Sequence, residues 1–113
     1  WTAGAMVSDL ADLRTWARLL ANGDLLSPAT QAARLTFRPL HPTQPIFYGL
    51  AIGRFFGFLG HNGGIAGYSS MMLHDPSVDA TIIAAANLSG LTGGVGDTIV
   101  AKIIARFFPD RIA

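Results

Sequence analysis

Three prolines in a short stretch divide this chain into a part with helical spacing of apolar residues and a part with extended spacing. Pro39, Pro42 and Pro45 interrupt the backbone between residues 38 and 45, where we expect a surface loop without regular structure. Before this loop, apolar side chains recur at the spacing of amphipathic helices. After it, aromatic and aliphatic runs alternate with glycines and turn residues, which favours strands. The chain must therefore combine helices with a sheet.

Three segments carry the start and stop signals of helices, namely capping residues before an apolar stripe and a glycine or proline after it. The predicted helices cover 8–23 with Ser8 as N-cap and Gly23 after its end, about 28–35 with Ser27 as N-cap, and Gly96 or Asp97 to about Phe108, stopped by Pro109. The predicted strands cover 47–52, 55–59, 65–74 and 81–86, with a turn at 75–79. The last of these strands is uninterrupted apolar, so we expect it to be buried on both faces and central. This order predicts an α+β fold, an antiparallel sheet with helices packed on it.

Composition excludes several classes of protein. The chain has 113 residues, a formal charge of +1 and no cysteine, so neither nucleic-acid binding nor disulfide or thiolate chemistry is expected. No apolar run is long enough to span a bilayer, and no transmembrane segment is expected. Only 13% of the residues are charged, about half the usual share. Since the chain also opens at Trp1 with no signal peptide, we expect it to be a piece of a larger protein that covers part of its surface.

The densest cluster of unusual residues is GHNGGIAGY, at 60–68. Asn62 followed by Gly63 between apolar runs is a strong hairpin signal, and in that interpretation His61 is only a polar residue beside a turn. Alternatively, a strand edge lined with glycine lets a substrate carbonyl approach backbone N–H groups, while His61 projects into the same cleft as an acid or base. Spacing alone favours neither interpretation.

The sequence resembles a known family at this point. GHNGGIAGYSSMML is similar to the third-motif strand of the penicillin-recognising serine hydrolases, which include class C β-lactamases, serine D-alanyl-D-alanine carboxypeptidases and related esterases. Their motif is Lys or His, a variable residue and Gly, which His61, Asn62 and Gly63 match in order. Five further segments resemble the family in the same order: AGAMVSDLADLRTWARLL, LLSPATQ, FYGLAI, TIIAAANLSG and the C-terminal amphipathic helix.

The resemblance implies the C-terminal part of a β-lactamase/transpeptidase-like fold. Residues 1–46 would be a helical segment and loop, 47–90 antiparallel strands, and 91–113 the C-terminal helix. It places the tripeptide along an inner strand rather than at a turn. It implies that His61 assists proton transfer or binds a substrate carboxylate, and that the N–H of Gly64 is one donor of an oxyanion hole. Gly63 would leave room for substrate, and Asn62 stands in the substrate-binding position where the family often has Ser or Thr.

The family's other motifs are missing. The nucleophile motif S-x-x-K is absent, because the only lysine, Lys102, follows Ile99 at that spacing. Tyr68-Ser69-Ser70 has the form of the second motif, but we interpret Tyr68 as a packing residue of the strand. The chain thus corresponds to roughly the last third of the family's domain, and it is expected to be inactive alone.

The resemblance implies that the complete protein is a serine hydrolase, similar to D-Ala-D-Ala carboxypeptidases and β-lactamases, which acts through an acyl-enzyme. Its partners would be the N-terminal part of the same domain and a small peptide, β-lactam or ester substrate, with no cofactor. The alternatives are an esterase of the same fold, a non-catalytic relative whose cleft binds a peptide, and a free-standing small domain. The resemblance favours the cell envelope or export as its location.

Other polar residues give weaker signals. His74 before the 75–79 turn is expected to be a solvated strand end, and His41 is interpreted as a residue of the proline loop rather than as a rim residue of a site. The histidines and aspartates show no metal-ligand spacing, so no metal site is expected. Met71 and Met72 lie on opposite faces of a strand, which places at least one of them in the core.

Overall fold

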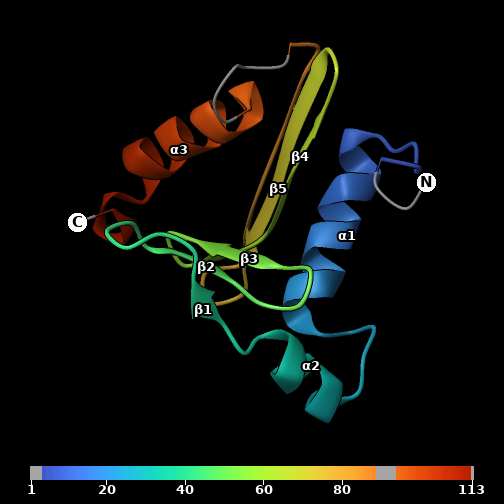
Figure 1. Ribbon diagram of the computed structural model, residues 1–113, viewed down its shortest axis with the longest axis vertical. Coiled ribbons are helices and arrows are strands. Elements are labelled where there is room, and N and C mark those ends of the chain that lie inside the picture. The colour runs from blue at the N-terminus through green and yellow to red at the C-terminus, as the bar shows by residue number, and fades with distance from the viewer. Residues whose placement is uncertain (1–3, 89–93, 113) are drawn as a thin grey trace.

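The computed structural model describes residues 4–88 and 94–112, and Figure 1 shows their arrangement. Within these residues the fold is α+β, as predicted, with a six-stranded antiparallel sheet whose strands follow chain order from β1 to β6. The elements are α1 (Leu10–Asn22), α2 (Pro28–Arg34), β1 (Arg38–Pro39), β2 (Ile46–Tyr48), β3 (Gly53–Phe55), β4 (Phe58–Ile65), β5 (Tyr68–Asp75), β6 (Ala80–Ala86), α3 (Val95–Phe107) and the 3₁₀ helix η1 (Pro109–Arg111).

The predicted helices are confirmed with small changes at their ends. The N-cap of α1 is Asp9 rather than Ser8, because the Asp9 carboxylate accepts a hydrogen bond from the backbone N–H of Asp12 at 2.8 Å. Gly23 ends this helix with a positive φ of 82°. Ser27 caps α2 as predicted. α3 begins at Val95, just before the predicted start.

The sheet differs from the prediction in several places. The predicted strand 47–52 ends at Tyr48, and the predicted strand 55–59 is divided by the turn at Phe56 and Gly57, which separates β3 from β4. The proline segment contains a short strand, β1, which pairs with β2. It tolerates Pro39 because it is the edge strand, where a missing N–H need not break a ladder. The run 65–74 is not one strand, because a two-residue turn at Ala66 and Gly67 divides it into the end of β4 and β5. Gly67 adopts a positive φ of 82° there.

Asn62 and Gly63 lie inside β4, so the hairpin interpretation of this pair is wrong. The turn predicted at 75–79 is confirmed between β5 and β6. The prediction for the last strand is wrong in two respects, because β6 is the last strand of the sheet rather than a central one and it is not buried on both faces. Ile82 and Ala84 on β6 are buried, whereas Ala85, on the opposite face of the strand, is exposed.

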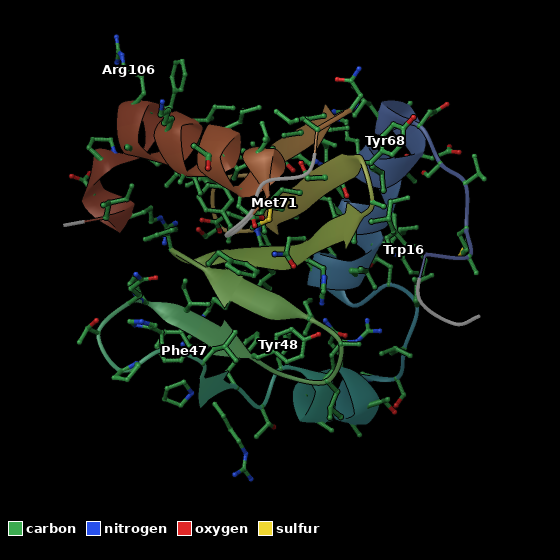
Figure 2. All side chains as sticks on the ribbon, turned by 45° about the horizontal axis from the view of Figure 1, so that its top comes forward. Trp16, Phe47, Tyr48, Tyr68, Met71 and Arg106 are labelled. Atoms are coloured by element: carbon green, nitrogen blue, oxygen red, sulfur yellow. The ribbon has the colours of Figure 1, made fainter. Side chains whose placement is uncertain are left out.

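Helices cover both faces of the sheet. Figure 1 shows α3 on one side of β4 and β5 and α1 on the other. The core lies between the sheet and α3, where Met71 is labelled in Figure 2. Its buried members are Phe58, Met71, Leu73, Ile82, Ala84, Val100 and Ile104. Met72, on the opposite face of β5, is only partly buried, as expected of this pair. On α1, Ala17, Leu20 and Ala21 are buried.

His74 is buried, so the prediction of a solvated strand end is wrong. It lies within β5, and its Nδ1 pairs with the Thr81 hydroxyl of β6 at 2.9 Å. Burial, and to a smaller extent the charge of Arg18, lower the pKa of His74 below its ordinary value. The imidazole is therefore a neutral part of the interior near neutral pH.

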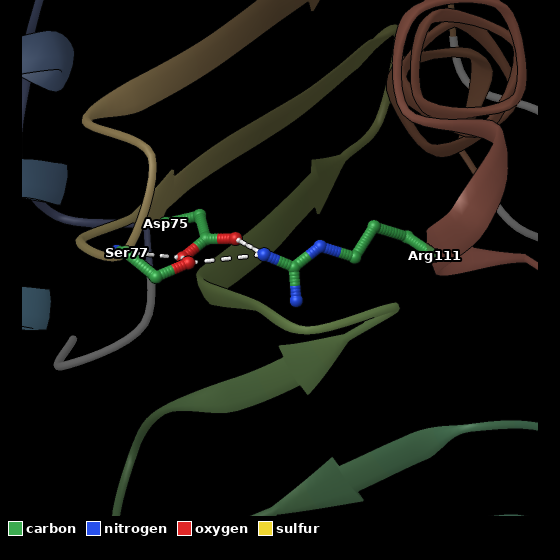
Figure 3. Close-up of polar contacts among 3 residues, drawn as sticks. All are labelled: Asp75, Ser77 and Arg111. Atoms are coloured by element: carbon green, nitrogen blue, oxygen red, sulfur yellow. Dashed lines mark hydrogen bonds and ion pairs between the residues drawn. The ribbon is translucent and has the colours of Figure 1, made fainter.

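The next residue, Asp75, ties the β5–β6 turn to the C-terminal end of the described chain. Its buried carboxylate forms an ion pair with Arg111 of η1 and accepts hydrogen bonds from the backbone N–H and the hydroxyl of Ser77 (Figure 3). The Ser77 hydroxyl oxygen also accepts a hydrogen bond from Arg111 at 3.0 Å. This group of three residues fastens η1 against the sheet.

Candidate functional site

The second half of β4 has a free edge. β3 pairs with β4 only as far as Gly60, and among the described residues no strand pairs with the same edge beyond it. The other edge of β4 pairs with β5 through Ile65. Residues 61–65 therefore border β5 on one side and open space or other polypeptide on the opposite side.

The turns at the two ends of β4 decide which backbone groups face the free edge. β3 and β4 are joined by a two-residue turn, in which Phe56 and Gly57 have positive φ values of 53° and 89°, as in a type I′ turn. The residues that flank such a turn direct their N–H and C=O groups at each other, and this orientation alternates along the strand. Counting from Phe58, Asn62 and Gly64 direct their backbone groups to the free edge. Counting from Ile65 at the other turn gives the same result.

The imidazole of His61 is held at both ring nitrogens. Its Nδ1 lies within hydrogen-bond distance of the Asn62 carbonyl oxygen, and its Nε2 lies 2.7 Å from the hydroxyl oxygen of Tyr48 on β2. A carbonyl oxygen can only accept, so Nδ1 carries the proton. In the neutral imidazole Nε2 is then an acceptor, and the Tyr48 hydroxyl donates to it. The two rings meet edge to face, with centroids 5.6 Å apart.

The side chain of Asn62 faces the start of α3. Its amide Nδ2 donates to the Asp97 carboxylate at 3.2 Å, and the same carboxylate oxygen accepts from the Gly94 backbone N–H at 2.9 Å. Asp97 thereby caps α3 and fixes the position of Asn62 at once. Its other carboxylate oxygen is buried without a hydrogen-bond partner among the described residues. Asn62 is predicted to bind substrate, but in the structure its side-chain amide already donates a hydrogen bond to Asp97.

The glycines of β4 serve different needs. A Cβ on Gly60 would lie 1.9 Å from the Met72 carbonyl oxygen, so only glycine fits between the strands there. A Cβ on Gly63 would lie 2.6 Å from the Ser70 hydroxyl oxygen, so close packing against β5 already accounts for this glycine. A Cβ on Gly64 would meet nothing within 4 Å. Beside the Gly64 backbone there is space for another molecule.

Two grooves meet along this part of β4. The groove on the α3 side encloses about 680 Å³ and the groove on the α1 side about 850 Å³. Residues 61–65, Tyr68 and Ser69 line both. Asp97 and Gly94 complete the first groove, and Met6, Leu13 and Ala85 contribute to the second. The four predicted site residues, His61, Asn62, Gly63 and Gly64, therefore lie together on the rim that separates two concavities.

Tyr48 and Asp97 are two contributors to this arrangement that the sequence interpretation missed. Tyr48 stands in the segment FYGLAI, and only the pairing of β2, β3 and β4 brings its hydroxyl to His61. Conversely, Tyr68 is 58% exposed at the tip of the β4–β5 hairpin (Figure 2), so its assignment as a packing residue is wrong. His41 is exposed, and its Nδ1 pairs with the backbone N–H of Thr43, away from the grooves.

Residues 4–88 and 94–112 contain no cluster of three or more acidic, histidine or cysteine side chains suited to a metal ion. In the same part of the chain, every helix is too short or too polar to cross a membrane.

The arrangement defines a class of fold. An antiparallel sheet with helices on both faces matches the α+β architecture of the penicillin-recognising enzymes. Among solved structures, the chain is similar to a D-stereospecific amidohydrolase from Streptomyces sp., an enzyme with the β-lactamase/transpeptidase fold. The TM-score is 0.72 and the sequence identity 27%.

The likeness covers 90% of this chain but only 30% of the amidohydrolase chain. The chain thus spans less than a third of that enzyme's length. A scan against protein-family models gives no match, and a search of curated proteins gives none either.

Proposed function

We propose that this chain forms one wall of the active site of a serine hydrolase that cleaves amide bonds through an acyl-enzyme. The nucleophilic serine and its base would come from polypeptide outside this chain. Three observations support the proposal: the likeness to a D-stereospecific amidohydrolase, the free edge of β4, and the groove beside His61 and Gly64. The likeness to an amidohydrolase favours amide substrates built on a D-amino acid over β-lactams and esters.

Gly64 would stabilise the tetrahedral intermediate. When the serine oxygen attacks the substrate carbonyl carbon, negative charge collects on the carbonyl oxygen. The Gly64 N–H is directed to the free edge of β4, and Gly64 lines both grooves. Such a donor, fixed by a strand, contributes about a hundredfold or more to the rate. The space beside Gly64 would admit the substrate backbone.

His61 would act on the same intermediate from the neighbouring position. Its imidazole lies on the rim of both grooves, and both of its nitrogens have partners within the chain. It would bind a substrate carboxylate in its charged form, or assist the proton transfer that frees the leaving amine when the Tyr48 hydroxyl releases Nε2 to the substrate. Asn62, held by Asp97, would keep the carbonyl that orients His61 in place.

The uncovered apolar surface supports a partner from the same domain. On α1, Leu10 is 55% exposed and Trp16 is 46% exposed. Phe107 on α3 and Ile65 at the end of β4 are also exposed. Large apolar side chains gathered on helix faces and at the groove rim are typical of surfaces that pack against protein. Residues 1–113 would then be the C-terminal part of a single domain.

The observation that carries the proposal is the open Gly64 amide beside His61 in the groove, and a labelling experiment tests it. We expect the complete polypeptide to react with a fluorophosphonate probe and to hydrolyse a D-amino acid amide faster than its L counterpart. His61→Ala should lower kcat by about a hundredfold while labelling is retained. Turnover of esters but not amides would support the esterase alternative. Binding without labelling would indicate a non-catalytic relative, and unchanged turnover in His61→Ala would refute the role of the imidazole.

A further inference from the structure

Tyr48 contacts the proposed site through the His61 imidazole, and the proposed chemistry gives it no direct role. It lies on β2, two strands away from β4, and its hydroxyl oxygen is 2.7 Å from His61 Nε2. Tyr48 lines neither of the two grooves. Its hydroxyl reaches the imidazole from the side of β3 and β2, which is the free-edge side of β4, just beyond the last pair that β3 forms with β4.

We propose that Tyr48 is a positioning residue that holds the His61 imidazole in the same orientation when the ring is neutral and when it is charged. This inference rests on the proposed function of His61. The Asn62 carbonyl fixes the proton on Nδ1, so the second hydrogen bond must suit Nε2 in both of its states. A hydroxyl is suited to this task because it can donate to the bare nitrogen of the neutral ring and accept from the N–H of the charged ring.

A residue without this double capacity would hold only one of the two states. An ammonium group or an amide N–H can only donate, so it could not form a hydrogen bond with the Nε2–H of the charged ring. A carboxylate can only accept, so it could not form one with the bare Nε2 of the neutral ring. The edge-to-face contact between the two rings adds a steric limit on rotation of the imidazole. Tyr48 also sits on a paired strand, opposite Gly53, so its own position is set by the sheet rather than by a loop.

Kinetics of the complete polypeptide test the proposal with a double-mutant cycle. Tyr48→Phe removes only the hydroxyl and retains the ring contact. We expect it to lower kcat about tenfold and to change KM less than about twofold, because the imidazole is displaced mainly when it acts on the intermediate. In the His61→Ala background the same substitution should change kcat less than about twofold, since the group through which Tyr48 acts is gone.

A matched control is Thr15→Val, which also removes one hydroxyl hydrogen bond, to the Ala11 carbonyl on the exposed side of α1. It should leave kcat and KM unchanged. If Tyr48→Phe lowers kcat equally in the wild-type and His61→Ala backgrounds, its role is structural and the positioning role is refuted. A melting temperature unchanged by Tyr48→Phe would show that a lower kcat does not come from partial unfolding.

A spectroscopic measurement keeps the test independent of activity. In ¹⁵N spectra of the complete polypeptide, His61 should show a protonated Nδ1 and an Nε2 that accepts a hydrogen bond, and Tyr48→Phe should shift only the Nε2 resonance towards that of an unbonded nitrogen. An Nε2 resonance unmoved by the substitution would overturn the inference. If the polypeptide hydrolyses no substrate, the proposed function fails, whereas this spectrum still decides whether Tyr48 holds the ring.

Discussion

Two glycines of β4, Gly60 and Gly64, differ in the space that is open to an added side chain. We expect Gly60→Ala to lower the free energy of unfolding by about 3 kcal/mol or more, because the new methyl would collide with the Met72 carbonyl oxygen. Gly64→Ala, on the same strand, should change it by less than about 0.5 kcal/mol, since the methyl would enter open space. Denaturant titration of the two variants measures both values. Equal losses would contradict the register of β4 against β5.

His74 gives the chain a pH-dependent stability. Burial lowers the pKa of this imidazole in the folded state, so the unfolded chain takes up the proton first as the pH falls. The free energy of unfolding should therefore decrease as the pH drops below about 6.5, the ordinary pKa of histidine, and continue to decrease down to the folded-state pKa.

Denaturant unfolding between pH 5 and 8 measures this dependence. His74→Asn, which keeps an amide atom near the position of Nδ1, should reduce the slope in this window. The exposed His41 offers a control for the substitution itself, since His41→Asn removes an imidazole from the surface rather than from the interior. A wild-type slope retained in His74→Asn would show that another group is responsible.

Histidine environments show why single residues are hard to place from sequence. His74 stands directly before a strong turn signal, which favours exposure, yet β5 extends through Asp75 and α1 covers that part of the sheet. Its burial depends on a helix more than fifty residues earlier in the chain. The contact between Tyr48 and His61 likewise depends on the pairing of three strands and leaves no local signal.

At the scale of elements, local patterns were sufficient for the helices and insufficient for the turns. Capping residues and apolar stripes gave α1, α2 and α3 within a few residues. The Asn62-Gly63 pair carries the stronger turn signal, yet the chain turns at Ala66 and Gly67. Cross-strand packing of β4 against β5 overrides the local preference, because a turn at Asn62 would leave half of each strand unpaired.

The connection between the β5–β6 turn and η1 depends on a buried charge. Arg111→Ala should lower the free energy of unfolding by about 2 kcal/mol, because it leaves the buried Asp75 carboxylate without its cation. The figure lies below that of a fully buried pair because the Arg111 side chain is about one-third exposed. Thermal or denaturant unfolding measures the loss.

The ion pair between Arg18 and Asp79 is a matched control, since its Asp79 side chain is 72% exposed. Arg18→Ala should cost less than about 1 kcal/mol. A larger loss for Arg18→Ala than for Arg111→Ala would refute the assignment of Asp75, Ser77 and Arg111 as the fastening of η1.

At the scale of the whole molecule, hydrophobic periodicity predicted the α+β class correctly, and the family resemblance placed the glycine-lined strand where residues alone left two possibilities. The sequence could not show which part of the chain's surface other polypeptide would cover. The accessible surface is 7484 Å², about a quarter more than the roughly 6,000 Å² expected of a self-contained globule of this mass. Tyr68, predicted to pack, stands in the uncovered part.

This excess surface leads to a prediction about the chain expressed on its own. If Leu10, Trp16 and Phe107 normally contact further polypeptide, the isolated 113 residues should associate or bind a hydrophobic dye, and should melt over a broad range. Co-expression with the remainder of the polypeptide as a separate chain should yield a soluble complex that melts cooperatively. Sedimentation and calorimetry measure both properties. A monodisperse monomer with a sharp transition would instead identify a free-standing domain, for which the active site would have no second wall.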